Sequence, residues 1–434
     1  PHPQSGGPKR TAPQPRQGTR PADGSPTAMG LQRAATAIEQ TCAPGLGEGG
    51  PHPRADSSLG GFGRSRASLK HTSTFGHYAS YETDWFMDLF GFREVSYKDT
   101  QRRLRARPLT SAPDAPWVLE GESGQSYQAG RFWLPSLGEL EERALQLGGP
   151  EALRGRLRVQ NVRGDVALKH MDPENRHATF QVASQFNCLE FLGPQARPEM
   201  GVTGYVRDKT QGPACSVACG PATVFRNYFA QVDGQQGQRA DRQINNLQRL
   251  SAKLGNEPEG RYFRVQGGYT LADNRGLKRL NVALDRVDPA AYQGLRESLC
   301  VGLHEDVQVT SCKWGECPVW DEEQTVTQVF GSACSVSYSG NDKGLWEPFA
   351  RLVLSASYEA TLWAALLTAL RHDGEAGSRR VYLTCLGGGV FGNDMRWIAD
   401  AMEEALAKFR HVGLEVYIVT FSGPIPRQLE RLER

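Results

Sequence analysis

The chain of 434 residues is long enough for roughly two or three domains and a sizeable hydrophobic core. Its 50 Lys and Arg residues nearly balance 48 Asp and Glu residues, and the net charge of +2 gives no reason to expect a nucleic-acid partner. No run of about eighteen apolar residues is present, so we expect no membrane span. The nine cysteines, scattered and odd in number, suit reduced thiols, and we expect an intracellular, cytoplasmic protein.

The first 72 residues are rich in Pro, Gly, Ser and Arg, and their first aromatic residue is Phe62. Such a segment buries too little apolar surface to offset its ordering entropy. We therefore predict a disordered basic arm over residues 1–72. The same composition also fits part of an organelle-targeting peptide, and that alternative stays open.

Aromatic residues become dense at residues 78–90, where we expect the folded part to begin. Apolar and polar residues alternate over residues 156–162 and 177–183, as they do in half-buried strands. These patterns predict an α+β extension over residues 73–180, packed on a catalytic domain formed by residues 181–434.

Strand-like and helix-like segments alternate after residue 186. We predict strands at residues 186–191 and 224–229 and a short packed helix at residues 211–219. A Gly- and Gln-rich loop, residues 233–241, is expected to lead into a helix that ends at Leu254.

The pattern continues to the end of the chain. It predicts strands at residues 326–330, 381–386 and 414–421, a long helix at 346–370 and a further helix at 397–406. Repeated strand–helix–strand units imply right-handed crossovers and an α/β fold with a mixed, mostly parallel sheet flanked by helices. In such sheets ligands bind beyond the carboxyl ends of the strands.

The most informative segment is the loop that follows the strand expected at residues 381–386. It consists of Gly387, Gly388, Gly389, Val390, Phe391, Gly392 and Asn393. Glycine lets the backbone approach a ligand closely and point several N–H groups one way, and the helix N-terminus behind it adds a positive dipole end. We predict a seat for a phosphate or pyrophosphate.

Two carboxylates, Asp233 and Asp241, flank the other loop, which should lie at the same edge of the sheet. A pyrophosphate seat beside carboxylates indicates a nucleotide-sugar ligand, and we expect Asp241, helped by Asp233, to orient ribose hydroxyls and a water. A helix cap at Asp241 and a plain turn at Asp233 are the alternatives. Asn187 and Glu190 are expected to bind substrate. The alternatives are a backbone-satisfying role for Asn187 and an ion pair for Glu190.

Two groups of residues invite other chemistry. Cys312, Cys317 and Cys334 have too loose a spacing for a convincing zinc site, and ordinary thiols are the favoured alternative. His304 and Asp306 resemble a base-plus-acid cluster, for which we favour a structural or solvated role. We expect neither a metal nor a cofactor.

Several motifs together resemble a known family. Residues 386–392 are similar to the diphosphate-binding loop of macrodomains, and residues 224–241 resemble their Asn-containing strand and catalytic loop. Further motifs resemble the MavL-like branch of macrodomain ADP-ribosyl hydrolases; they are residues 187–191, 210–215, 226–229, 241–244, 326–330 and 346–350.

The resemblance implies a macrodomain-like fold and a hydrolase that removes ADP-ribose from a modified protein, such as ubiquitin or another arginine-modified protein. The implied partners are ADP-ribose and the ADP-ribosylated protein, without nucleic acid or membrane and with the oligomeric state open. Gln211 and Asn227 join the expected substrate-binding residues.

The sequence also departs from the family pattern. The catalytic loop is largely Gln and Arg at residues 235–239, and the Gly-Gly-Gly motif with two adjacent glutamates of poly(ADP-ribose) glycohydrolases is missing. Two other functions therefore stay open: a reader that binds ADP-ribose without cleaving it, and another nucleotide enzyme on a doubly wound sheet.

Overall fold

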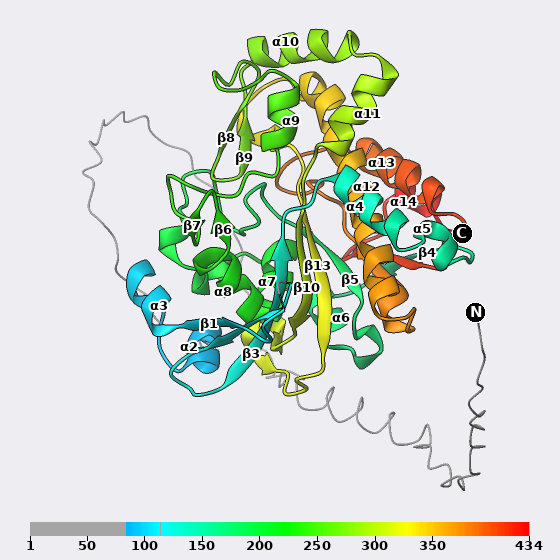
Figure 1. Cartoon of the computed structure of the whole chain (residues 1–434). Helices are drawn as coiled ribbons and strands as arrows, with labels where there is room; N and C mark the ends of the chain where they lie inside the picture. The colour runs from blue at the N-terminus through cyan, green and yellow to red at the C-terminus, as the bar shows by residue number, and fades with distance from the viewer. Residues whose placement is uncertain (1–83, 113, 434) are drawn as a thin grey trace, which may run out of the picture. The chain divides into compact units, whose positions relative to one another are not determined.

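A computed structural model describes residues 84–112 and 114–433, which belong to one compact unit (Figure 1). The arm expected over residues 1–72 lies outside the described residues, so its predicted disorder stays a prediction.

One nine-stranded sheet organises the described chain. Its strands, in spatial order, are β1 (Arg105–Pro108), β2 (Trp117–Glu120), β3 (Ser126–Trp133), β10 (Gly302–Gln308), β13 (Thr325–Gly331), β5 (Thr179–Ala183), β14 (Arg380–Leu383), β15 (Glu415–Thr420) and β4 (Arg158–Arg163). From β13 to β4 all neighbours are parallel, and from β1 to β13 all are antiparallel. The expected mixed α/β sheet is confirmed. Strands from both sides of residue 180 share this sheet, and the expected division into an extension and a catalytic domain stays a prediction.

Helices cover both faces of the sheet (Figure 1). On one face α12 (Glu347–Arg371) packs against β13, β5 and β14, with α13 (Met395–Lys408) beside it. On the other face lie α6 (Val166–Met171), α7 (Gln211–Ala218) and α8 (Gly220–Tyr228). Crossover helices on both faces bury the central strands, which explains why β13 is buried along its whole length.

The long helix α12 is apolar on nearly every side, as a helix enclosed by protein must be. With the turn before it, Lys343–Arg371, it is long and apolar enough to cross a membrane by length and composition. Its apolar window is nevertheless entirely buried inside the protein, between the sheet, α13, α4 and α11.

Shorter elements complete the fold. They are α2 (Trp85–Phe90), α3 (Tyr97–Arg103), α4 (Leu137–Gln146), α5 (Gly149–Ala152), α9 (Gln248–Lys253), α10 (Asn274–Asp285), α11 (Pro289–Glu297), α14 (Arg427–Glu430), and the two-residue or three-residue strands β6 (Gln231–Val232), β7 (Gln235–Gln236), β8 (Arg264–Gln266), β9 (Tyr269–Leu271), β11 (Ser311–Cys312) and β12 (Cys317–Pro318).

Three expected elements differ in the structure. Residues 186–191 form a buried loop, and residues 224–229 belong to α8 and its end, so both strand predictions are wrong. Every residue of α8 is buried, and a short apolar run without alternation does not separate a strand from a buried helix. The helix expected after Asp241 begins only at Gln248, and in the segment before it the Gln238 side chain accepts a hydrogen bond from the Ile244 N–H at 3.0 Å.

Candidate functional site

A cavity of about 530 Å³ lies beyond the carboxyl ends of three neighbouring parallel strands. Ser332 follows β13, Ser184 follows β5 and Thr384 follows β14, and all three line the cavity. The central strand β5 lies between β13 and β14, and both of these neighbours come later in the chain. This is the sheet edge at which α/β proteins bind ligands, and the volume suits a nucleotide-sized molecule.

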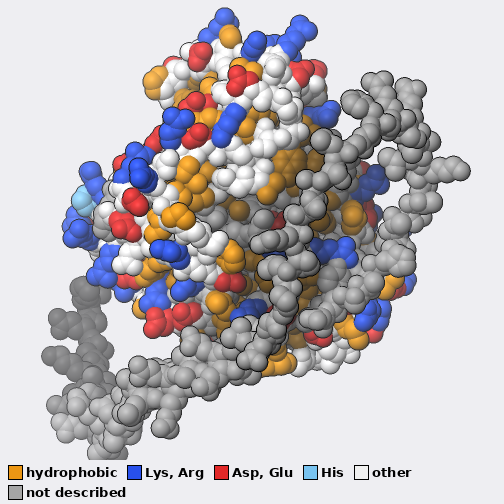
Figure 2. Space-filling view, turned by 180° about the vertical axis from the view of Figure 1, so that it is seen from behind, with side chains coloured by type: hydrophobic (Ala, Val, Ile, Leu, Met, Phe, Trp, Pro, Cys, Tyr) orange, Lys and Arg blue, Asp and Glu red, His pale blue; other side chains and the backbone are white. Residues whose placement is uncertain are grey.

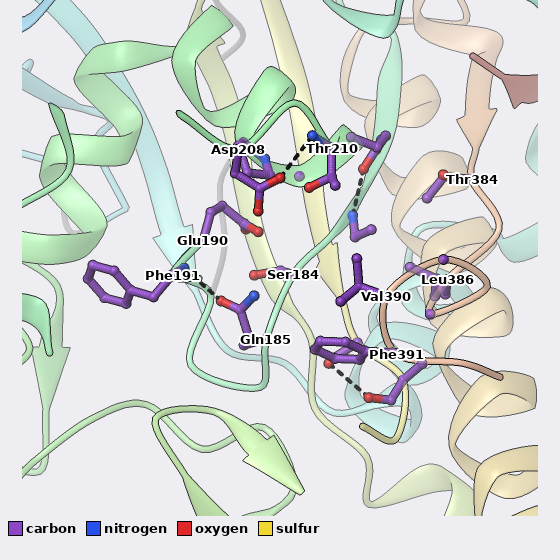
Figure 3. Close-up of a pocket in the computed structure, with 18 of the residues that line it drawn as sticks. Ser184, Gln185, Glu190, Phe191, Asp208, Thr210, Thr384, Leu386, Val390 and Phe391 are labelled. Carbon is purple, nitrogen blue, oxygen red and sulfur yellow. Dashed lines mark hydrogen bonds between the residues drawn. The ribbon is translucent and has the colours of Figure 1, made fainter. Parts of the chain in front are cut away.

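Five parts of the chain build the walls. The lining residues are Ala183, Ser184, Gln185, Glu190, Phe191, Leu192, Arg207, Asp208, Lys209, Thr210, Gln211, Gly212, Pro213, Tyr269, Gly331, Ser332, Ala333, Tyr338, Thr384, Cys385, Leu386, Gly387, Gly389, Val390 and Phe391. Figure 3 shows Glu190 and Asp208 on one wall and Val390 and Phe391 on the wall opposite.

The glycine-rich loop after β14 offers free backbone donors to this cavity. Three of its N–H groups donate to carbonyl oxygens of the same loop at 2.9–3.0 Å; they belong to Gly388, Gly392 and Asn393. Four others have no acceptor among the described residues: those of Gly387, Gly389, Val390 and Phe391. The same four residues line the cavity. Adjacent unpaired N–H groups bind anions, so the loop can hold a phosphate or diphosphate.

The glycines of this loop have different roles. Gly387 has φ +67°, and a Cβ there would lie 2.5 Å from the Asn393 amide, so the turn requires glycine. Gly388 faces Ile398 of α13 and does not line the cavity. A Cβ on Gly389 would meet no atom within 4 Å. Gly389 is therefore the position where a side chain would enter the cavity without disturbing the fold.

The helix behind the loop contributes less than expected. α13 is capped by Asp394, whose carboxylate accepts a hydrogen bond from the Arg396 N–H at 2.9 Å. That carboxylate occupies the place of an anion at the helix N-terminus. The donors for a ligand therefore come from the loop.

Three aromatic rings form one end of the cavity. Phe391 lies 5.3 Å from Tyr269 and 5.6 Å from Tyr338, measured between ring centroids, and the two tyrosines are 4.9 Å apart. Tyr269 is held by a hydrogen bond from its hydroxyl to the Phe191 carbonyl at 2.7 Å. Such a wall can pack on a ribose or a base.

A buried carboxyl group is the chemically distinctive feature of the opposite wall. Glu190 is 2% exposed, and its Oε1 has no hydrogen-bond partner among the described residues. Burial raises the pKa of the Glu190 carboxyl to about 8, with the Asp208 charge adding to the rise and Ser184 and Arg226 opposing it. The carboxyl is therefore mostly protonated at neutral pH and can donate a proton to a bound ligand.

Glu190 is held in a loop that the surrounding fold fixes closely. The Gln185 side-chain oxygen accepts from the Phe191 N–H at 3.1 Å, and the Tyr205 hydroxyl accepts from the Glu190 N–H at 3.0 Å. On the far side Gly212, in α7, lets the helix approach, because a Cβ there would lie 2.4 Å from Glu190 Oε2. Without a side chain at this position the carboxyl fits between β5 and α7.

Arg226 places a buried positive charge behind this wall. It is fully buried on α8, donates to the Cys188 carbonyl at 3.1 Å and to the Thr223 hydroxyl at 3.0 Å, and lies 3.8 Å from the centre of the Phe330 ring. No carboxylate of the described residues forms an ion pair with it. Its charge acts on Glu190 through space and favours the ionised carboxylate.

The other carboxylate of the cavity is Asp208. It is half-buried, and its Oδ1 accepts from the Thr210 N–H at 3.0 Å. Glu190 and Asp208 therefore place two carboxyl groups on the wall opposite the glycine loop, where Arg207 and Lys209 also line the cavity.

Several expected site residues lie outside the cavity. Asp233 and Asp241 are exposed and do not line it, since their loop follows helix α8 and not a strand of the sheet. Their catalytic roles stay predictions. Asp233 has φ +46°, in the left-handed region common in turns.

The expected asparagines are buried and bound within the protein. Asn187 donates to the Gln243 side chain at 2.8 Å, Asn227 to the Pro198 carbonyl at 3.1 Å and Asn393 to the Cys334 carbonyl at 2.8 Å. Gln211 does line the cavity, but its amide bonds the end of β5, where the Ala183 N–H donates to it at 2.8 Å. Gly388 and Gly392 are likewise absent from the lining.

Sequence reasoning did not find Asp208, Tyr269 or Tyr338. Asp208 and Thr210 stand directly before α7, which the sequence did predict, so the loop before that helix carried a usable signal. Tyr269 and Tyr338 come from the β8–β9 hairpin and from a turn after β13, and no local pattern places them together.

The residues that could hold a metal lie at the other end of the sheet. His177, Asp306 and His372 offer ligand atoms within 4.8 Å of one another. Asp306 already accepts from His372 Nε2 at 2.9 Å and pairs with Arg371 at 3.3 Å, and the two imidazole rings are stacked 3.8 Å apart. A metal ion bound here would have to displace these contacts.

The two other residue groups considered in the sequence, His304 with Asp306 and the three cysteines, do not each form a single cluster in the structure. His304 is buried against Arg226, at 3.3 Å between nitrogens, whereas Asp306 faces His372. They therefore form no common acid–base cluster. Cys312 and Cys317 are register partners in a short hairpin, and Cys334 lies past the carboxyl end of β13.

Comparisons with known proteins give limited likenesses. No protein-family model matches the chain, and no curated protein matches it in sequence. Among solved structures it is similar to poly(ADP-ribose) glycohydrolase from Thermomonospora curvata bound to the inhibitor ADP-HPD, with 14% identity, a TM-score of 0.33, and 72% of this chain and 91% of that chain covered.

The corresponding enzyme from Deinococcus radiodurans in complex with ADP-ribose gives 12% identity and a TM-score of 0.33 over 69% of this chain and 93% of that one. Both are poly(ADP-ribose) glycohydrolases, whose signature motif this sequence lacks, and the expected MavL-like branch receives no support and stays a prediction. Likenesses at this level do not identify a family.

Proposed function

We propose that the protein binds ADP-ribose in this cavity and hydrolyses the bond that joins it to a modified protein. The observation that carries the proposal is the pairing of a free-donor loop with a buried, protonated acid across one cavity. The loop supplies four N–H groups for the diphosphate, and the aromatic end formed by Phe391, Tyr269 and Tyr338 packs on a ribose.

Glu190 is the proposed general acid. As the bond at the anomeric carbon breaks, its carboxyl donates a proton to the departing side chain of the modified protein, and a water adds at that carbon. The products are ADP-ribose and the unmodified side chain, and the water's second proton returns the carboxylate to its acid form. Asp208 is placed to stabilise the positive charge that develops on the ribose.

The binding half of the proposal is tested by calorimetry with free ADP-ribose, ATP and NAD. We expect ADP-ribose to bind with micromolar affinity, on the order of −8 kcal/mol. Gly389→Glu should abolish this binding, because the side chain and its charge enter the anion seat in open space. Gly389→Ala is the matched control and should bind within about threefold of wild type. Equal binding by all three proteins would show that the loop is structural.

Turnover distinguishes the hydrolase from a reader. Release of ADP-ribose from a modified protein by wild type, and its loss in Glu190→Gln with binding retained, would support hydrolysis. Tight binding without turnover on any modified protein would identify a reader module on the same scaffold.

A further inference from the structure

A second hollow, of about 540 Å³, adjoins the first and has a different character. The two share Tyr338, whose ring also closes the aromatic end of the first cavity. The second hollow lies between the loop before β8, the β8–β9 hairpin and the first turns of α10. Polar groups make up most of its wall.

Cations dominate this part of the molecule. Arg261, Arg264 and Arg279 line the second hollow, and Arg275, Lys278 and Arg286 line a shallower one beside it that shares Arg261 and Arg279. The opposing carboxylates in these linings are Glu259 and Asp273. Figure 2 shows Lys and Arg side chains standing along the upper end of the molecule, where Figure 1 places α10.

Local carboxylates do not neutralise these charges. None of the six cations has an ion pair within 4.0 Å in the described part of the chain, whereas many other arginines, such as Arg296 and Arg351, do. Asp273 is committed to capping α10, where it accepts from the Gly276 N–H at 2.6 Å. Unpaired like charges repel one another, and an anionic partner relieves that repulsion.

The hollow is also firmly built. Gly276 brings α10 onto the chain at Tyr262, since a Cβ there would lie 2.2 Å from the Tyr262 carbonyl. Arg279 donates to the Arg261 carbonyl at 2.7 Å and ties the loop to the helix. The cations therefore project from a fixed floor beside the ADP-ribose cavity.

We propose that this basic hollow is a docking subsite for acidic side chains of the ADP-ribosylated protein, an inference that rests on the proposed function. Guanidinium groups bind carboxylates in a bidentate manner. A nucleic acid or a polymer of ADP-ribose fits less well, because Tyr262 and Phe263 are buried, and Tyr338, the other aromatic residue of the lining, is packed against Tyr269 and Phe391 of the first cavity.

The test compares peptides that carry one ADP-ribose on arginine, flanked by Glu, Ser or Lys. For wild type at about 50 mM salt we expect kcat/KM to be at least about tenfold higher with Glu flanks than with Lys flanks, and this preference should shrink at high salt. Arg264→Glu combined with Arg275→Glu should remove the preference. The Ser-flanked peptide and free ADP-ribose should behave as with wild type.

The matched control changes the same net charge elsewhere. Arg105→Glu with Arg107→Glu alters two exposed arginines of β1, at the far end of the sheet, and should leave the preference intact. If both double variants lost the preference, the change in net charge alone would explain the effect, and the proposed subsite would be wrong. Equal rates on all flanks by wild type would also overturn it, with ADP-ribose binding still intact.

If no arginine-linked peptide is turned over, binding of unmodified peptides tests the proposed subsite instead. A Glu-rich peptide should bind wild type and the β1 control, but it should not bind the variant that carries Arg264→Glu and Arg275→Glu. Tighter binding of a single-stranded oligonucleotide or of poly(ADP-ribose) than of the Glu-rich peptide at equal charge would refute the proposed partner. Absence of free ADP-ribose binding would instead refute the proposed function itself.

Discussion

Replacing Glu190 by glutamine tests the buried acid directly. The substitution keeps the size and shape of the side chain but removes its proton and its charge. Two properties should change together: the pH dependence of folding stability and the rate of hydrolysis. Both follow from the same observation, a carboxyl that burial holds protonated, with its pKa raised to about 8.

The sign of the stability effect follows from linkage. Below pH 4.5 the carboxyl is protonated in both states and contributes no pH dependence. Above that pH the unfolded chain ionises while the folded protein keeps the proton, so the free energy of unfolding of wild type falls until the pH passes about 8. The loss approaches about 1.4 kcal/mol per pH unit and totals on the order of 5 kcal/mol at most. The glutamine variant lacks this loss.

Urea unfolding followed by tryptophan fluorescence at pH 5, 6, 7 and 8 measures the difference. We expect Glu190→Gln to gain stability relative to wild type at each step. Glu142→Gln, on the exposed face of α4, is the matched control and should change unfolding free energy by less than about 0.5 kcal/mol. Turnover by Glu190→Gln should fall by about 10²–10⁴ while ADP-ribose still binds. A difference from wild type that does not vary with pH would mean that Glu190 is ionised in the folded protein, and the reasoning would fail.

Three further outcomes are expected. Asp241→Ala should leave turnover within about threefold of wild type, because the side chain is exposed and outside the cavity; a dead but stable and binding-competent variant would restore Asp241 to the chemistry. Glu94→Ala should lower the free energy of unfolding by about 3 kcal/mol or more, because the buried N–H groups of Val202 and Thr203 and the Tyr228 hydroxyl lose their hydrogen-bond acceptor. Phe391→Ala should weaken ADP-ribose binding by about tenfold in calorimetry, through loss of the aromatic end, and unchanged affinity would remove that ring from the ligand.

The glycine loop was predictable because its signal is local. Three consecutive glycines between a strand and a helix constrain the backbone whatever the rest of the chain does, and the structure places four residues of the loop on the cavity. The separate roles of Gly388 and Gly389 were not predictable. Whether a glycine faces Ile398 or open space depends on where α13 packs, which the loop sequence does not encode.

The placement of Asp233 and Asp241 depended on a nonlocal step. Their loop would lie at the ligand edge only if residues 224–229 formed a strand of the sheet. Those residues instead end helix α8, which packs on β3 and β10, so the loop leaves from the end of that helix. The expected position of Asp233 and Asp241 at the ligand edge of the sheet thus rested on one element whose type was predicted wrongly, while their catalytic roles stay predictions. Burial decided the element type, and burial is a property of the assembled fold.

The same nonlocality hid the role of Glu190. Its sequence neighbours suggested a strand and a substrate contact, and only the assembled walls show that one carboxyl oxygen lacks a partner. A protein that merely reads ADP-ribose gains nothing from such a group, since an amide or an apolar side chain would fill the space without a pH-dependent loss of stability. Instability of this kind is retained where chemistry uses the buried acid, which favours hydrolysis over passive recognition.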